Sequence, residues 1–112
     1  MENMITEDYV SYKVALELKK NGFDERVISF YEPGDIQRPT LQMAMKWLRV
    51  KHNLSVEVYR TNRGYISGII AIPRGNYIKF LDEDDDDLSS GEYKTWDDAC
   101  EAAILYCLEY MI

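Results

Sequence analysis

The chain has 112 residues, enough for one folded domain, and 46% of them are apolar, which is sufficient for one hydrophobic core. Its formal net charge of −7 disfavours nucleic acid as a partner, because a phosphate backbone is bound by clustered Lys and Arg and we expect no such cluster here. No apolar run reaches the roughly twenty residues of a membrane span and the first residues lack signal-peptide features, so we expect one cytoplasmic domain over residues 1–112.

The first predicted helix lies near the N-terminus and ends before Gly22. Thr6 is the expected N-cap, because a threonine hydroxyl can accept a hydrogen bond from a backbone N–H of the first helical turn. Gly22 suits the left-handed position that follows many helices. Between them, Val10, Val14 and Leu18 recur at helical spacing and predict a narrow apolar stripe.

Residues 24–39 are predicted to connect the first two helices without much regular structure. Pro33, Gly34 and Pro39 are turn signals that interrupt any long element. The apolar residues of Val27–Tyr31 could form a short strand within this connector.

The second helix is predicted to begin after a Thr40 N-cap and to end near His52, with Asn53 in the left-handed position that follows. Its apolar residues form two stripes. One stripe contains Leu41, Ala44, Met45 and Leu48, and the other contains Met43, Trp47 and Val50. Because both sides are apolar, we expect both to be covered, the second by the first helix or by a second subunit.

The apolar period changes from helical to alternating at Leu54, which predicts strands. Residues 65–72 are apolar on both faces and form the expected central strand. Turn-forming residues occupy 61–64 and 73–76, and residues 77–81 supply a further strand. Together these segments predict a three-stranded antiparallel meander.

The last helix is predicted to begin after a Thr95 N-cap, with Asp97 and Asp98 at the positive end of its dipole. One broad face is apolar, and it contains Trp96, Ala99, Cys100, Ala103, Ile104, Cys107, Leu108 and Met111. The predicted fold is therefore an α+β domain in which the second and third helices cover one face of the meander and the first helix packs beside them.

Four side chains remain after the core has been assigned and are predicted to contact a partner. Leu105, Tyr106 and Tyr110 lie outside the apolar stripe of the last helix, and Trp47 lies on the second stripe of the preceding helix. Aromatic residues are enriched in protein interfaces. We therefore expect a protein partner, with a homodimer as one form of it.

The sequence predicts no catalytic, cofactor or metal site. Cys100 and Cys107 are about 10 Å apart along one helical face, too far for a disulfide or a shared zinc ion, and are expected to be reduced core residues. His52, the one histidine of the chain, is expected to interact with a helix C-terminus. Because no phosphate-binding glycine loop or nucleophile elbow occurs in the sequence, we do not expect an enzyme.

The acidic run Asp82–Asp87 concentrates negative charge in one short stretch. Its first, third and fifth residues have the spacing of the first calcium ligands of an EF-hand. Asp87, however, stands where that loop needs glycine, and Tyr93 stands where it needs a bidentate glutamate. We expect a solvated loop; weak divalent-cation binding and imitation of DNA charge are the alternatives.

The order helix, three strands, helix after Pro39 resembles that of a double-stranded RNA-binding domain, and the stretch DDACEAAILYCLEYM resembles the final helix of such a domain. That family contacts phosphates with basic residues at the start of the last helix. Here Asp97, Asp98 and Glu101 occupy the region. The resemblance therefore implies a shared architecture without the RNA-binding function.

Three stretches of the chain resemble a family of small proteins from Bacteroides-type gut bacteria and their phages or mobile elements. They are ITEDYVSYKVALELKKNGFDE, RPTLQMAMKWLRVKHNLSVEV and DDACEAAILYCLEYMI, about half of the chain together. The family has no assigned activity. The resemblance therefore implies a bacterial or phage cytoplasmic protein and assigns no site residues.

We expect a small binding or regulatory module that acts through protein–protein contacts, without catalysis or a cofactor. Two alternatives stay open. One is an acidic decoy that imitates DNA and occupies a DNA-binding protein; the other is a nucleic-acid-binding module with the topology of a double-stranded RNA-binding domain.

Overall fold

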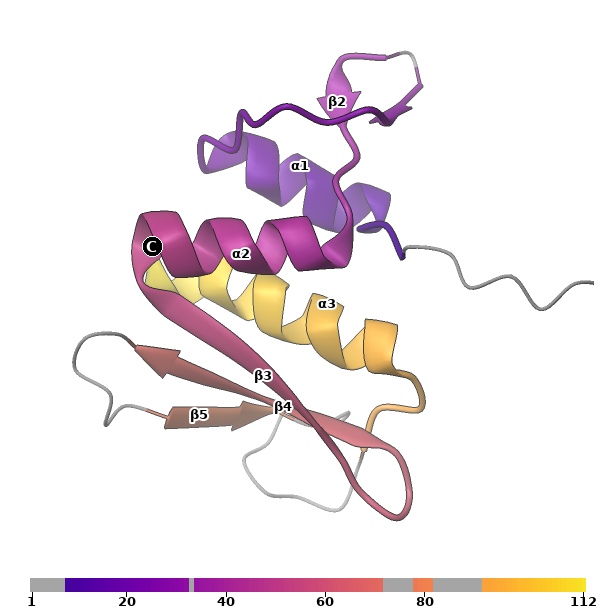
Figure 1. Ribbon diagram of the computed structural model, residues 1–112, viewed down its shortest axis with the longest axis vertical. Helices are drawn as coiled ribbons and strands as arrows, with labels where there is room; N and C mark the ends of the chain where they lie inside the picture. Colours follow the sequence, from indigo (N-terminus) through magenta and orange to yellow (C-terminus); the bar gives the residue numbers. More distant parts are fainter. Residues whose placement is uncertain (1–7, 33, 72–77, 82–91) are drawn as a thin grey trace, which may run out of the picture.

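The computed structural model of the chain describes residues 8–32, 34–71, 78–81 and 92–112. In chain order its elements are α1 (Tyr12–Lys20), β1 (Phe30–Tyr31), β2 (Ile36–Gln37), α2 (Leu41–His52), β3 (Leu54–Arg60), β4 (Tyr65–Ala71), β5 (Ile78–Leu81), α3 (Trp96–Tyr106) and a π-helical turn, Cys107–Met111 (Figure 1). Helices and antiparallel strands are mixed along the chain, so the expected α+β class is confirmed.

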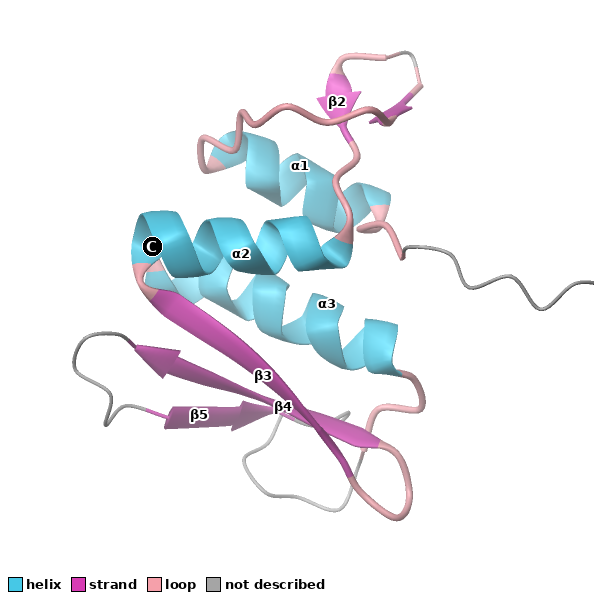
Figure 2. Cartoon of the chain, viewed as in Figure 1, coloured by secondary structure: helices cyan, strands magenta, loops and turns pink. Residues whose placement is uncertain are grey.

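The elements stack in layers, with α2 and α3 in the middle (Figure 2). β3, β4 and β5 form an antiparallel sheet in that order, and α2 and α3 lie on the same side of it. α1 and the two-stranded β1–β2 sheet lie on the other side of these helices, away from the larger sheet. α1 therefore packs on the C-terminal helix and on β2, and not on the three-stranded sheet.

The N-terminus of α1 differs from the prediction. Its N-cap is Ser11, whose Oγ accepts from the Val14 backbone N–H at 3.3 Å; the prediction of Thr6 was wrong, and Thr6 itself lies outside the described residues. Immediately before the helix the chain is extended, and the Val10 N–H donates to the Pro39 carbonyl at 3.0 Å. This long-range pairing keeps Tyr9 and Val10 out of the helix, and helical periodicity in the sequence does not reveal it.

The C-terminus of α1 follows the prediction. Gly22 has a φ of +91°, in the left-handed region that glycine adopts without a steric penalty. The Phe23 N–H bonds back to the Leu18 carbonyl at 3.0 Å and closes the last turn. The chain thus reverses sharply and leads residues 23–28 along the side of the helices.

The connector between α1 and α2 contains a two-stranded sheet that was not predicted. β1 pairs antiparallel with β2, Phe30 opposite Gln37. The Gly34 N–H donates to the Tyr31 carbonyl at 2.7 Å within the turn. The predicted strand at Val27–Tyr31 is confined to its last two residues, too few for an alternating pattern to identify.

The caps of α2 and α3 are those that the sequence predicts. Thr40 Oγ1 accepts from the Met43 N–H at 3.1 Å, and Thr95 Oγ1 accepts from the Asp98 N–H at 3.1 Å. Asn53 follows α2 with a φ of 58°. Each of these contacts lies within a few residues of sequence, which explains why local patterns suffice to find them.

One continuous core joins the layers. Its largest fully buried side chains are Leu18, Leu41, Leu48, Ile69, Ile104, Val10, Val14, Pro39, Cys100 and Cys107. Both cysteines are unbonded, as predicted. Ser67 on β4 is also fully buried, and its hydroxyl has no hydrogen-bond partner among the described residues.

Candidate functional site

The segment 23–28, which leaves α1, lines three hollows in the described part of the molecule. One hollow lies between α1 and the β1–β2 hairpin, and two lie along the outer side of α2. The hollows on the two sides of the segment differ in charge. They also differ in how many of their lining side chains already bond to or pack on other parts of the protein.

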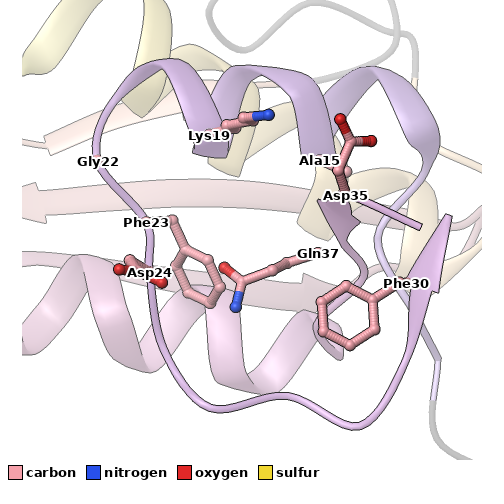
Figure 3. A pocket seen from close by; sticks show the side chains of 8 residues that line it. All are labelled: Ala15, Lys19, Gly22, Phe23, Asp24, Phe30, Asp35 and Gln37. Carbon is pink, nitrogen blue, oxygen red and sulfur yellow. The ribbon is translucent and has the colours of Figure 1, made fainter. Parts of the chain in front are cut away.

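The hollow beside α1 has a volume of about 550 Å³ (Figure 3). Its lining residues are Ala15, Lys19, Gly22, Phe23, Asp24, Phe30, Asp35 and Gln37. In Figure 3 the rings of Phe23 and Phe30 lie on either side of the Gln37 side chain. A volume of this size is within the range of small-molecule sites. Whether the hollow can bind a ligand therefore depends on whether its polar side chains already form bonds within the protein.

The central side chains of this hollow hold the loop together. Gln37 Nε2 donates to the Glu25 backbone carbonyl at 2.5 Å, and the Phe23 ring meets Trp47 edge-to-face with centroids 5.4 Å apart. The charged lining residues, one lysine and two aspartates, are exposed and extend in different directions (Figure 3). The arrangement therefore offers no converging set of polar groups for catalysis.

The two hollows along α2 have volumes of about 310 and 440 Å³ and share Arg26 and Met43, so they form one continuous surface that we call the α2 groove. It is lined by Tyr9, Glu25, Arg26, Val27, Ile28, Arg38, Pro39, Thr40, Met43, Lys46, Trp47, Val50 and Lys51. One wall is thus the outer face of α2, and the other is the segment that leaves α1.

The floor of the α2 groove is apolar. Trp47 is 7% exposed, because Phe23 and His52 pack against its ring. Val50 is 60% exposed and Ile28 is 93% exposed. The second apolar stripe of α2 is thus covered at Trp47 by the chain that follows α1, and it stays open to solvent at Val50.

Four cationic side chains line the α2 groove, together with the single carboxylate of Glu25; they are Arg26, Arg38, Lys46 and Lys51. That the fold brings these cations to one surface was not predicted from the sequence. α2 has no acidic residue, and none occurs between Asp35 and Glu57. This gap in the acidic residues is the sequence signal that could have identified the surface, although Arg26 joins it only through the fold.

Arg38 is held in a fixed orientation at the end of the groove where α2 begins. Its Cζ lies 4.3 Å from the centroid of the Tyr9 ring and 5.4 Å from that of Tyr31. Nη1 donates to Ser29 Oγ at 3.1 Å, while Nε is buried without a hydrogen-bond partner among the described residues. A guanidinium stacked in this way loses little conformational entropy when it binds a carboxylate or phosphate.

The four predicted contact residues do not form one surface. Trp47 lies in the floor of the α2 groove, whereas Leu105, Tyr106 and Tyr110 do not line it. Leu105 and Tyr106 are half-buried against the core. Tyr110 is 71% exposed and packs against Tyr106, with ring centroids 4.9 Å apart.

The thiols are not placed for chemistry. Burial raises the pKa of Cys107 to about 12, and burial, together with the charges of Asp97, Asp8 and Glu101, raises that of Cys100 to about 12. Protonated, fully buried thiols are poor nucleophiles. No group of three His, Cys, Asp or Glu side chains suited to a metal ion occurs in the described part of the chain, and the acidic run Asp82–Asp87 lies outside it.

Within the same part of the chain, no helix is long and apolar enough to cross a bilayer. In comparisons with known proteins, no family model, no curated protein and no solved structure matches this chain.

Proposed function

We propose that the protein is a non-enzymatic binding module that takes a segment of a partner protein into the α2 groove. One observation carries the proposal: Val50 and Ile28 line a concave surface and yet are 60% and 93% exposed. Exposed aliphatic side chains in a concavity are typical of docking surfaces, because a partner that covers them removes apolar area from water.

The size of the groove supports a short helical segment as its occupant. α2 has 12 residues, so a groove along it is about 18 Å long. A partner helix of about three turns spans that length. Such a helix can place apolar residues from successive turns on the floor of the groove, which is a common mode of peptide recognition.

The scaffold that we propose for this function is an antiparallel three-stranded meander with α2 and α3 on one face, which leaves the outer side of α2 for a partner. The raised pKa values of the thiols support a non-enzymatic role.

A nucleic-acid strand is the second candidate occupant, and the four cationic side chains of the groove favour it. Glu25 and the two exposed aliphatic residues favour a protein, since contacts to a phosphate backbone use neither carboxylates nor aliphatic side chains. The protein partner therefore ranks first.

Site-specific photo-crosslinking tests the docking proposal. A photoreactive phenylalanine analogue replaces Val50 in one full-length variant and Lys13, an exposed residue of α1, in the control. Both are irradiated in extract of the source organism. We expect a discrete covalent protein adduct from position 50 and none from position 13. Equal adducts from both positions, or no adduct from position 50, contradict the proposal.

A further inference from the structure

We propose that the segment received by the α2 groove is an acidic amphipathic helix, with apolar side chains on the groove floor and carboxylates paired with the cationic side chains around it. This inference rests on the proposed function and adds the chemistry of the partner. It depends on the contrast between the groove and the rest of the molecule.

The α2 groove has the opposite charge to the whole chain. The chain carries a formal net charge of −7, whereas the groove is lined by four cations and one carboxylate. Among the described residues outside the groove, eleven Asp and Glu face eight Lys and Arg, so an acidic segment is attracted to the groove more than to the rest of the described surface. The charge distribution therefore favours one docking position and disfavours the others.

The cations and the apolar residues alternate along α2 in helical register. Met43, Trp47 and Val50 are spaced by four and three residues, and Lys46 and Lys51 lie beside them in the groove lining. A partner helix that contacts the apolar row with residues spaced three and four apart brings its flanking positions over the lysines. Glu or Asp at those flanking positions completes the match.

Arg38 defines which end of the groove receives the most strongly bound carboxylate. Its guanidinium is stacked on Tyr9, so it is oriented before the partner arrives. Thr40, the N-cap of α2, lines the same hollow, and the positive end of a helix dipole also favours a negative charge there. Arg26 lies in both hollows and joins this end to the lysine end.

Peptide binding to the full-length protein tests the inference. The probe is a synthetic helical peptide of about 18 residues, five turns, with leucines on one face and glutamates flanking them. One control peptide has the same composition in scrambled order, a second has lysine in place of glutamate, and a single-stranded oligonucleotide serves as a non-protein polyanion. Affinities are measured by calorimetry at low and at high salt.

The matched protein variants differ only in where charge is reversed. Lys46→Glu/Lys51→Glu changes the groove, and Lys13→Glu/Lys94→Glu changes two exposed lysines outside it, so that both variants have the same net charge. We expect the acidic helix to bind the wild type, to bind the groove variant about tenfold more weakly, and to bind the control variant as it does the wild type. High salt should weaken the wild-type complex as well.

Three results overturn the inference: no binding of the acidic helix, equal binding of the lysine or scrambled peptide, or tighter, groove-dependent binding of the oligonucleotide. A fourth is self-association of the protein, measured by light scattering, that the groove variant abolishes, because the occupant is then a second copy. If the crosslink from position 50 forms while the charge reversals have no effect, the docking function stands and the acidic chemistry fails.

Discussion

A carboxylate oxygen of Glu101 on α3 accepts a hydrogen bond from the backbone N–H of Ser11 at 2.5 Å, so the last helix caps the first across 90 residues of sequence. The Ser11 hydroxyl accepts from the Val14 backbone N–H of the same helix end at 3.3 Å. Two acceptors from distant parts of the chain thus satisfy the N-terminus of α1, and one of them is charged.

Removal of the negative charge of Glu101 should destabilise the N-terminus of α1. Glu101→Gln keeps the shape of the side chain and weakens its acceptor, so we expect the free energy of unfolding to fall by about 1 kcal/mol. Glu109→Gln is the matched control, because Glu109 is exposed near the C-terminus and should change stability little. Urea unfolding of both variants checks the prediction, and equal effects would count against the cap.

The buried thiols should make the protein sensitive to alkaline pH. The pKa of each thiol rises from 9.0 to about 12 in the folded chain, so the protonated form is favoured there, mainly by burial. Their contribution to stability is complete below pH 9.0 and is lost as the pH rises toward 12, because only the unfolded thiols ionise in that window.

Two measurements check this. Unfolding in urea at a series of alkaline pH values should show a smaller loss of stability in a Cys107→Ala variant than in the wild type. At neutral pH a thiol reagent should label both cysteines in urea and neither in the native protein. Rapid native labelling would mean that the cysteines are accessible.

Gly64 should tolerate no side chain. A Cβ at this position would lie 2.3 Å from the Tyr93 carbonyl oxygen, which is a backbone atom and accepts from the Tyr65 N–H at 2.8 Å. We expect Gly64→Ala to lower the free energy of unfolding by roughly 1–3 kcal/mol, because the bridge between Tyr65 and Tyr93 must shift. Asn62→Ala, at an exposed position of the same turn, should change it by less than about 0.5 kcal/mol.

The two apolar residues of the groove should respond differently to substitution. Trp47→Ala removes a side chain that packs on Phe23 and His52, so we expect it to lower the free energy of unfolding by about 3–5 kcal/mol. Val50→Asp should change that free energy by less than about 0.5 kcal/mol and weaken binding of the acidic helix. Unfolding curves measure the contribution of each residue to stability, and calorimetric titrations measure its contribution to binding. Unchanged binding by the Val50 variant would show that Val50 does not contact the partner.

Replacement of Ser67 by alanine should stabilise the protein. Its buried hydroxyl has no partner among the described residues, so Ser67→Ala removes the desolvation cost of that group and should raise the free energy of unfolding by roughly 1 kcal/mol. Ser55→Ala is the comparison, because the Ser55 hydroxyl donates to Glu57 at 2.8 Å and its loss should lower stability. Destabilisation of both variants alike would indicate that the Ser67 hydroxyl is hydrogen-bonded in solution.

How far the sequence predicts the fold depends on the range of the contacts involved. Thr40, Asn53 and Thr95 act on groups within a few residues and were assigned correctly from local patterns. Ser11 was missed because its selection depends on Glu101 and on pairing with the chain before α2. The β1–β2 sheet was missed because each strand has two residues, too few to produce a period.

The same distinction applies to the candidate site. Trp47 was recognised as surplus apolar surface on α2, but its near-complete cover by Phe23 depends on how the chain turns after Gly22. The groove itself combines α2 with Arg26 and Arg38 from an irregular connector. Periodicity has no means of placing such residues in space.

The segment 23–28 separates the hollow beside α1 from the α2 groove. It is held by the packing of Phe23 on Trp47 and by the hydrogen bond from the Gln37 amide to the Glu25 carbonyl. A small molecule that entered on the α1 side and displaced this segment would narrow the space on the α2 side. By thermodynamic linkage, two occupants coupled through this segment would alter each other's affinity by the same factor.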